Sequence, residues 1–595
     1  MKFLKTIMAA LFCMAAASCS EIAFGDDFLG EAPESDGATL ETMFSSKNRA
    51  EQVLTRAYMG LKYGLPVASD NRMGNNVLEA LTDLSFSGGQ NISDGPINYY
   101  YNGALSAINV NDNGCRPTYK YGSETDKLTI RYAWIFIENV DRVPDMTIEE
   151  KEAKKAEAKM LIALSYFNML RYIGGFIYFD HSTSVSDNMS YKRNTFAESV
   201  DIIRSLLDDA IPHLPWKWSD AEDGRMTAAG AMALKFKLLH YAASPTFNSD
   251  TKWHPDADEY TCYGNYDVQR WKDAETAGRE FFEAVAAKGG YGLIMPTEDT
   301  HQARRNAFQQ AYYRRGGTEV LVSIRKGYDA SIHNILTNYG EPRICPTLNY
   351  VNMFAWEDGT DFPENFDWSN VVWNDAHKSP FFTVDADGTK TPTRDPRLYE
   401  TVAVPGDTHF DSKPAKVFIK KADDVLEGSG FLLMKFVMHT ANERAYPVQW
   451  PHTRIAEVML GYAEAICEAN NGPTDEAYKM VNDVRRRVGL PALPTMNKEQ
   501  FIDAVLRERA MELGYEEVRW FDLVRRNRVD DFRKKLYGLR SLAVDDDDDP
   551  SIFTFTRIDL SERFWVSNWD SRWYLSPIPQ NEINKNYGMT QNPGW

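Results

Sequence analysis

Cysteine is scarce in this chain of 595 residues: of the six present, two lie in the first twenty residues and the other four are far apart. No two of them form a CxxC pair, which excludes a compact zinc site and provides no sign of a disulfide framework. The ten histidines are also scattered, and no two stand four residues apart. We expect free, buried thiols at the four positions beyond the first twenty residues, which are Cys115, Cys262, Cys345 and Cys467.

The sequence also lacks the short motifs of common enzymes. It contains no HExxH, GxSxG, P-loop or GxGxxG sequence, so no residue is predicted to be catalytic. The formal charge is −19, and it becomes −21 without the two lysines of the amino-terminal leader. Such an excess of acid argues against binding to nucleic acid and against electrostatic adsorption to anionic lipid.

No metal site is predicted, although two acidic segments leave calcium open as an alternative. The segment Asp385 to Gly388 (DADG) begins like a calcium loop, but it lacks the later ligands and the closing Glu. A β-turn is the simpler interpretation. The acidic run Asp545 to Asp549 could collect calcium or form a solvated loop. We therefore expect no cofactor.

Long apolar runs are absent after the leader, since none approaches the roughly 18–20 residues that span a bilayer. The leader, Met1 to Ser18, has a basic start, an apolar centre and small residues before Cys19. This pattern is typical of a bacterial lipoprotein signal, in which the thiol of Cys19 is acylated. A plain secretory signal, which would leave Cys19 free, is the alternative. We expect a mature protein that is anchored to the membrane and does not span it.

Helical periodicity dominates the rest of the chain. Apolar residues recur at steps of three and four, and several segments stop at Gly-Gly or Pro. The segment 319–325 alternates like a short strand, whereas 85–120 and 363–393 are long, irregular loops. The predicted helices are 43–61, 127–143, 148–172, 196–214, 227–243, 271–287, 454–470, 475–488 and 498–526.

The densest stretch is RERAMELGYEEVRWFDLVRR, at positions 507–526. Its glutamates at 508, 512 and 516 interleave with arginines at 507, 509 and 519. Like charges four residues apart are unfavourable unless arginines bridge them. We expect a helix pair locked by Arg–carboxylate forks, with Trp520 and Phe521 in the core. The alternative, an acid/base pair of Glu508 and Glu512, is disfavoured because nearby arginines would keep both ionised.

This stretch, read as ER-x2-EL-x2-E-x2-RWFDL-x-R, resembles the signature of the SusD/RagB family of glycan-binding outer-membrane lipoproteins. Further pieces resemble the family in the same order, among them PTLNYVNMFAWEDGTDF, RDPRL and the closing QNPGW. The departures are Glu517, where Gly is usual, and Asn527, where an aromatic is common. The resemblance runs from residue 19 to residue 595.

The resemblance implies a mostly α-helical, SusD-like fold with TPR-like helix pairs, long irregular loops and a few short strands. Four parts are predicted. They are a signal peptide at 1–18, a tether at 19–41, an amino-terminal TPR-like part at 42–330 and a carboxy-terminal SusD/RagB part at 331–595, with the last two forming one compact unit.

Aromatic side chains are abundant, at 13% of the chain. Exposed rings in loops can cover the flat face of a sugar while polar neighbours pair with its hydroxyls. Packing of each ring beneath its own loop is the alternative. Three clusters are candidate ligand-binding residues, namely Tyr99, Tyr100, Tyr101 and Asn102, then Trp253 and Tyr260, then Trp368 and Trp373.

The function implied by the resemblance is capture of oligo- or polysaccharide at the cell surface without catalysis. The implied partner is a SusC-like TonB-dependent transporter of the outer membrane. Two other classes stay open. An all-helical glycoside hydrolase needs only a pair of carboxylates beside a cleft, and a TPR-type scaffold would bind protein alone.

Overall fold

The structure is a computed structural model. The predicted leader, Cys19, nearly all of the tether and Cys115 lie outside the residues that it describes. The described ranges are 39–62, 64–65, 78–88, 99–112, 119–121, 124–183, 190–313, 315–325, 344–409, 413–425, 428–437, 449–544 and 548–595.

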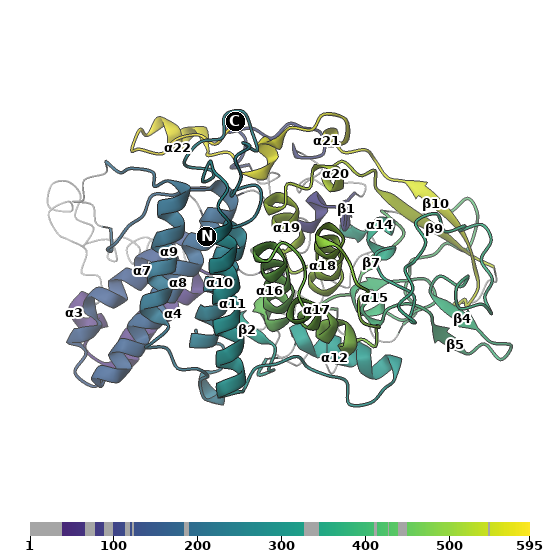
Figure 1. The fold of residues 1–595 in the computed structure, drawn as a ribbon, viewed down its shortest axis with the longest axis horizontal. Helices are drawn as coiled ribbons and strands as arrows, with labels where there is room; N and C mark the ends of the chain where they lie inside the picture. Colours follow the sequence, from purple (N-terminus) through teal and green to yellow (C-terminus); the bar gives the residue numbers. More distant parts are fainter. Residues whose placement is uncertain are drawn as a thin grey trace, which may run out of the picture.

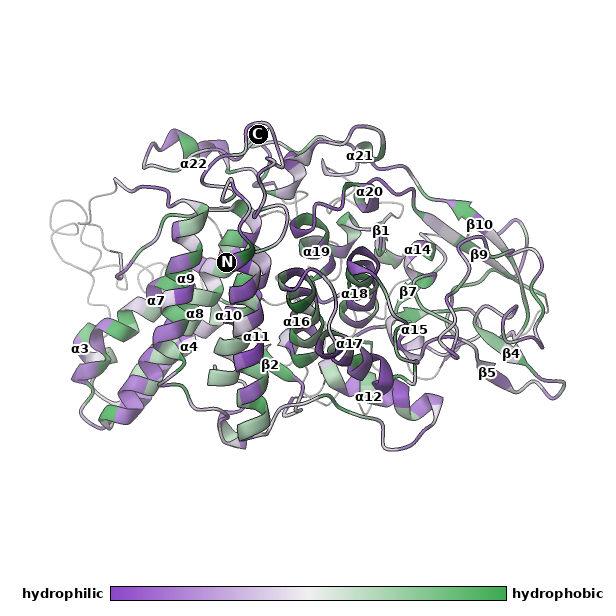
Figure 2. Ribbon diagram, viewed as in Figure 1, coloured by the Kyte–Doolittle hydropathy of each residue, from purple (hydrophilic) through white to green (hydrophobic). Residues whose placement is uncertain are grey.

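Helices of the amino-terminal part stand side by side, each packed on the next (Figure 1). Hydrophobic and hydrophilic residues interleave along them, as expected of helices with one buried face (Figure 2). The prediction of a mostly α-helical fold with TPR-like pairs is confirmed. The helices are α3 (Leu40–Met43), α4 (Lys47–Met59), α7 (Asp126–Asn139), α8 (Ile148–Ile173), α9 (Phe196–Ala210), α10 (Ala228–Ala242) and α11 (Val268–Lys288).

Local sequence signals account for the ends of α8, the longest of these helices. Thr147 and Glu150 form a capping box, in which each side chain accepts a hydrogen bond from the other residue's backbone N–H. At the far end Gly174 adopts φ +76°, which favours glycine and stops the helix. Nearly every residue from Ala156 to Ile173 is buried, so α8 runs through the core.

The carboxy-terminal helices pack against the first part through α11 and α16. One of them, α12 (His301–Tyr313), was not predicted, because its sequence HQARRNAFQQAYY has little apolar periodicity. The others are α14 (Leu348–Val351), α15 (Pro396–Thr401), α16 (Ile455–Ala469), α17 (Asp475–Arg487), α18 (Lys498–Leu513), α19 (Arg519–Arg525), α20 (Val529–Phe532), α21 (Phe564–Ser567) and α22 (Gln580–Asn584). Short 3₁₀ turns lie at Leu78–Leu81, Val140–Arg142, Asp220–Glu222 and Ser571–Tyr574.

Strands are short and form antiparallel pairs. The strand predicted at 319–325 is β2, and its partner comes from 130 residues further on. The pairs are β1 (Ser85–Ser87) with β3 (Ile344–Pro346), β2 (Val320–Ile324) with β8 (Trp450–Arg454), β4 (Phe382–Val384) with β5 (Lys390–Pro392), β6 (Val402–Ala403) with β7 (Leu432–Leu433), and β9 (Tyr537–Ala543) with β10 (Phe553–Asp559).

The segment Asp385 to Gly388 forms the turn between β4 and β5. Gly388 has φ +85°, and the Asp387 side chain accepts the N–H of Thr389 at 3.0 Å. The acidic run lies in the connection between β9 and β10, partly outside the described residues. Its Asp548 carboxylate is 2.9 Å from the ammonium of Lys420.

Among described cysteines, those at 262, 345 and 467 are buried free thiols, as predicted.

The helix predicted over 498–526 is wrong in its middle. After α18 ends, Tyr515 and Glu517 adopt φ +63° and +59°, and a new helix, α19, starts at Arg519. Left-handed residues interrupt the helical hydrogen bonds. The apolar period continues through the break, so spacing alone could not reveal it. As predicted, Trp520 and Phe521 are buried.

Charged side chains form a fully buried network where the two parts of the chain meet. The guanidinium of Arg454, at the end of β8, is 2.7 Å from carboxylates of both Glu319 and Glu516 and 3.0 Å from Glu512. Arg487 of α17 pairs with both Glu319 and Glu512. Arginines are the best donors for such sites because their planar fork binds carboxylates bidentately.

A third buried arginine extends this network along α18. Arg397 of α15 is 2.7 Å from Asp395 and 2.6 Å from Glu508. The ammonium of Lys435 is 2.7 Å from Glu516. These are the bridging cations that the glutamate spacing required, but they come from other elements.

The predicted helix pair locked by Arg–carboxylate contacts is present between Arg509 of α18 and Asp522 of α19. The three glutamates, however, take their arginines from outside the stretch 507–526. The arginines of the stretch bind other carboxylates. Arg507 binds Asp361, Arg509 binds Asp522, and Arg519 binds Asp83. Successive residues on a helix point in different directions, so arginines next to the glutamates face other neighbours.

Replacing Glu512 should test how much the network stabilises the fold. We expect Glu512→Gln to lower the free energy of unfolding by about 3–5 kcal/mol, because breaking one partner of a buried ion pair leaves charge uncompensated. Urea denaturation followed by circular dichroism would measure the change. The control is Asp209→Asn, which removes an exposed pair with Lys159 and should cost at most about 1 kcal/mol.

Comparison of the wild type with Glu512→Gln also gives a pH test. Burial opposes ionisation of Glu512, but Arg487, Arg454 and Arg397 outweigh it and hold its pKa well below the ordinary value of 4.5. Stability from this group is therefore present above pH 4.5 and is lost as the pH falls toward the lowered pKa. As the pH falls below 4.5, the free energy of unfolding of the wild type should therefore decrease more steeply than that of Glu512→Gln. Parallel curves would contradict this assignment.

Candidate functional site

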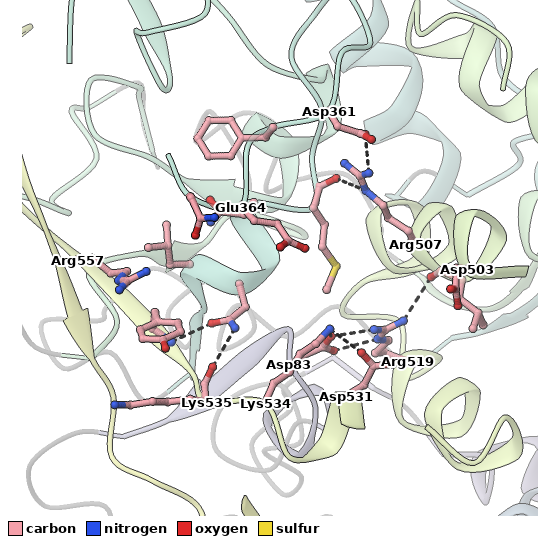
Figure 3. A pocket seen from close by; sticks show the side chains of 18 of the residues that line it. Asp83, Asp361, Glu364, Asp503, Arg507, Arg519, Asp531, Lys534, Lys535 and Arg557 are labelled. Carbon is pink, nitrogen blue, oxygen red and sulfur yellow. Dashed lines mark hydrogen bonds and ion pairs between the residues drawn. The ribbon is translucent and has the colours of Figure 1, made fainter. Parts of the chain in front are cut away.

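A cavity of about 640 Å³ opens in the carboxy-terminal part (Figure 3). We call it the cleft. Its lining comes from segments far apart in the sequence: Asp83, residues 348–353 on and after α14, residues 361–368, α18 with α19, and the strands β9 and β10. A volume of this size lies in the range of small-molecule sites.

One wall of the cleft is aromatic. Trp368 lines it with only 8% of its surface exposed, as little as Trp253, because its ring packs on Phe366 at 4.9 Å and on Phe555 at 5.7 Å. In the same lining, the guanidinium of Arg557 lies 4.6 Å from the ring centre of Tyr537. An arginine on a ring face offers both a flat surface and hydrogen-bond donors.

The opposite wall is charged, and its charges are paired. Arg507 donates to Asp361 at 2.6 Å and to the carbonyl of Met353 at 2.7 Å (Figure 3). Arg519 holds Asp83 at 2.8 Å. Each pair leaves further donor and acceptor positions that hydroxyl groups could use.

Asp531 shows the electrostatic character of this wall. Burial disfavours its charged form, but Arg519 and Lys534 outweigh that effect and keep its pKa below the usual value. It accepts from Lys534 at 2.6 Å and from Arg528 at 2.7 Å. A general acid needs a raised pKa, so Asp531 is unsuited to that role.

The glutamates at 508 and 512 are no acid/base pair in this structure. Both lie in the buried ion network, and the pKa of Glu512 is held far below its usual range. Neither lines the cleft. Both pair with buried arginines that join separate elements of the fold.

The first predicted cluster is not an exposed aromatic surface, which corrects our expectation. Tyr100 is 4% exposed and packs at 6.1 Å from Trp565 and 5.8 Å from Trp573. Tyr101 is 7% exposed; its hydroxyl donates to the carbonyl of Ala80 at 2.6 Å and accepts the N–H of Ser87 at 3.0 Å. The end of the chain covers this loop.

The flanking residues of that cluster are more accessible. Tyr99 is half-buried and its hydroxyl donates to Asp112 at 3.0 Å. Asn102 is exposed, and its side chain accepts the N–H of Ala104 at 3.0 Å. Neither lines the cleft.

The other predicted residues divide between the cleft and the packed interior. Trp253 is 8% exposed and lies 5.8 Å from Tyr574, so its expected exposure is also wrong. Tyr260 is half-buried beneath the guanidinium of Arg193, at 5.3 Å. Trp373 packs on Phe555 at 5.9 Å. Of all eight predicted residues, only Trp368 lines the cleft.

Sequence reasoning missed most of the cleft. Its polar residues lie on helices or short strands, where a charged residue in the sequence normally indicates only a face exposed to solvent. Asn349, for example, donates to the carbonyl of Lys535 at 3.0 Å and accepts the N–H of Tyr537 at 2.9 Å. No local signal distinguishes it.

Comparison with known proteins defines the class. A model of the SusD family matches residues 306–595, and a second, described as "starch-binding associating with outer membrane", matches residues 27–238. The fold and these matches define a carbohydrate-binding protein class associated with the outer membrane. The chain belongs to the SusD/RagB family, as the sequence resemblance predicted.

Relatives and solved structures agree with this assignment. A SusD-like protein of Formosa agariphila is 22% identical over 69% of this chain and 73% of its own. A SusD-like protein of Bacteroides ovatus is 23% identical over 66% of this chain and 64% of its own. The crystal structure of a SusD-like protein from Bacteroides fragilis has a TM-score of 0.71 at 20% identity, covering 95% of this chain and all of that one. A SusD-like carbohydrate-binding protein from the same species has a TM-score of 0.65 at 19% identity, covering 91% and 99%.

The buried hydroxyl of Tyr101 gives a test of its structural role. We expect Tyr101→Phe to destabilise the protein by about 1–3 kcal/mol, because the N–H of Ser87 and the carbonyl of Ala80 lose their shared partner. Thermal unfolding would measure it. The control is Tyr266→Phe, at a ring that is 48% exposed, which should stay within about 0.5 kcal/mol of wild type. Equal effects would contradict the burial described.

Proposed function

We propose that this protein captures oligo- or polysaccharide at the cell surface and delivers it, uncut, to a SusC-like TonB-dependent transporter. Family membership supports carbohydrate binding. The observation that carries the proposal is the cleft, where an aromatic wall faces a wall of paired charges. Sugars present flat C–H faces ringed by hydroxyls, and these two walls match those two features.

Within the cleft, we assign half-buried Tyr537 and the guanidinium of Arg557 beside it to the sugar faces, and the charged wall to the hydroxyls. Ion pairs such as Arg507–Asp361 suit hydroxyls because the arginine donates while the carboxylate accepts. The pairing also fixes the side chains before the ligand arrives, which lowers the entropy cost of binding.

Attachment to the outer membrane would come from acyl chains on Cys19. Among the described residues, no helix combines the length and apolarity needed to cross a bilayer. The family description supports association with the outer membrane. Display at the cell surface and the transporter partner rest on the family resemblance.

A glycan panel tests capture. We expect the purified protein to bind at least one oligosaccharide, and Asn365→Ala and Arg557→Ala each to weaken binding by about tenfold, or 1.4 kcal/mol. Both side chains are exposed in the cleft, so neither change should unfold the chain. Isothermal titration calorimetry with and without EDTA would measure affinity and any calcium requirement.

The matched control is Asp387→Ala, on the exposed turn between β4 and β5, which should bind as the wild type does. Incubation of the bound glycan with protein should release no reducing sugar. Failure of every glycan to bind, equal affinity in all variants, or steady release of reducing ends would each contradict the proposal.

Lipidation has its own test. We expect Cys19→Ala to abolish incorporation of labelled palmitate in cells and to move the protein from the membrane fraction to the soluble fraction, since a single thiol carries the anchor. Cys262→Ala, at a buried free thiol, is the control and should stay membrane-bound. Unchanged labelling in Cys19→Ala would refute acylation at this position.

A further inference from the structure

A second cavity, of about 290 Å³, lies in the amino-terminal helical part and shares no lining residue with the cleft. It is bounded by α7, α8, the segment that follows α8, and the chain around α22, which lies over the ends of these helices (Figure 1). We call it the helical pocket. No expectation from the sequence and no part of the proposed function uses it.

Tyrosine and phenylalanine rings line it from several sides, and their positions are fixed. Tyr166 stacks on Phe176 with ring centres 4.4 Å apart, and its hydroxyl accepts the N–H of Phe179 at 2.9 Å. Phe179 meets Tyr191 edge-on at 4.8 Å. Rigid rings at several angles make a preformed surface for another flat group.

The chain near its carboxyl end closes the pocket. The N–H of Tyr191 donates to the carbonyl of Tyr587 at 3.0 Å. Next to it, Gly588 has φ +105°, and a Cβ there would lie 1.8 Å from the carbonyl oxygen of Tyr191. Only glycine allows this approach, so the backbone holds Tyr587 against the pocket.

Cations outnumber carboxylates in the lining of the pocket, where Lys127, Arg131 and Lys585 accompany the single carboxylate of Glu582. The ammonium of Lys127 lies 4.1 Å from the ring centre of Tyr121, and among the described residues no carboxylate lies within ion-pair distance of it. The nearby carboxylate of Glu582 is engaged by Lys585 at 2.7 Å and by the hydroxyl of Tyr587 at 2.8 Å. Burial lowers the pKa of Lys127, a cost that an anionic ligand would offset.

We propose that the helical pocket binds a uronic acid residue, a pyranose ring that carries a carboxylate. The carboxylate pairs with Lys127, the ring face lies on the tyrosine wall, and the hydroxyls reach the remaining acceptor positions of Glu582 and the imidazole of His181. A neutral sugar would leave the ammonium unpaired, and a long apolar group would exceed a volume that suits about one sugar ring.

The two sites are separate, so uronate binding in the helical pocket does not depend on glycan binding in the cleft. A uronate site in the helical pocket would give the protein a second binding site for an acidic polysaccharide, or a binding site for a free sugar acid. Two linked sites raise apparent affinity only for a ligand that reaches both. Monosaccharides therefore test the helical pocket alone.

The experiment is titration of the full mature chain with glucuronate, galacturonate, glucose, galactose and benzoate, followed by calorimetry or ligand-observed NMR. We expect one of the uronates to bind, and the matching neutral sugar and benzoate to bind at least about tenfold more weakly. Lys127→Gln should reduce uronate affinity by about tenfold or more, and Lys127→Arg should retain most of it.

Controls separate this result from that of the cleft. Asn365→Ala, in the cleft, should leave uronate affinity unchanged, and thermal unfolding should verify that Lys127→Gln is folded. The proposal is overturned if neither uronate binds, if Lys127→Gln binds as well as wild type, or if benzoate binds as tightly as the uronate. It is equally overturned if the loss appears in Asn365→Ala instead.

Discussion

The buried contact between Arg454 and its three glutamates is the constraint on which the rest of the structure depends. Glu319 precedes β2, Arg454 ends β8, and Glu512 and Glu516 belong to the end of α18 and the turn after it. A buried charge is tolerable only when it is fully paired. The network therefore specifies where these elements meet more than it adds net stability, and it fixes their register over more than a hundred residues of intervening chain.

The helix α18 connects this network to the cleft. Its glutamates at 508 and 512 point to the interior, while Arg507, one residue away, points outward to Asp361 on the cleft wall. Because the inward face is locked by arginines from three other elements, the outward face is held in place as well. Rigid elements position binding groups more accurately than loops do. The irregular segments of the cleft can then vary without loss of its frame.

The sequence predicted what depends on local pattern. Spacing located most helices, and the glutamates at 508, 512 and 516 required buried cations. The sequence could not identify those cations, because only the tertiary fold places Arg397, Arg454 and Arg487 beside the glutamates. Tyr100 and Tyr101 lie in a polar, glycine-rich loop, so they were expected on the surface; Trp565 and Trp573, more than 450 residues later, cover them. The cleft joins segments from Asp83 to Arg557, and only Trp368 carried a local signal.

The division of the ion network between distant segments has a consequence for incomplete chains. Two family models match two separate ranges, 27–238 and 306–595, which invites the view of two modules. A product that stopped before α18 would still contain Arg397, Arg454 and Arg487, yet it would lack every carboxylate of that helix. Truncated translation products should thus have no native-like partly folded state and should be open to proteolysis.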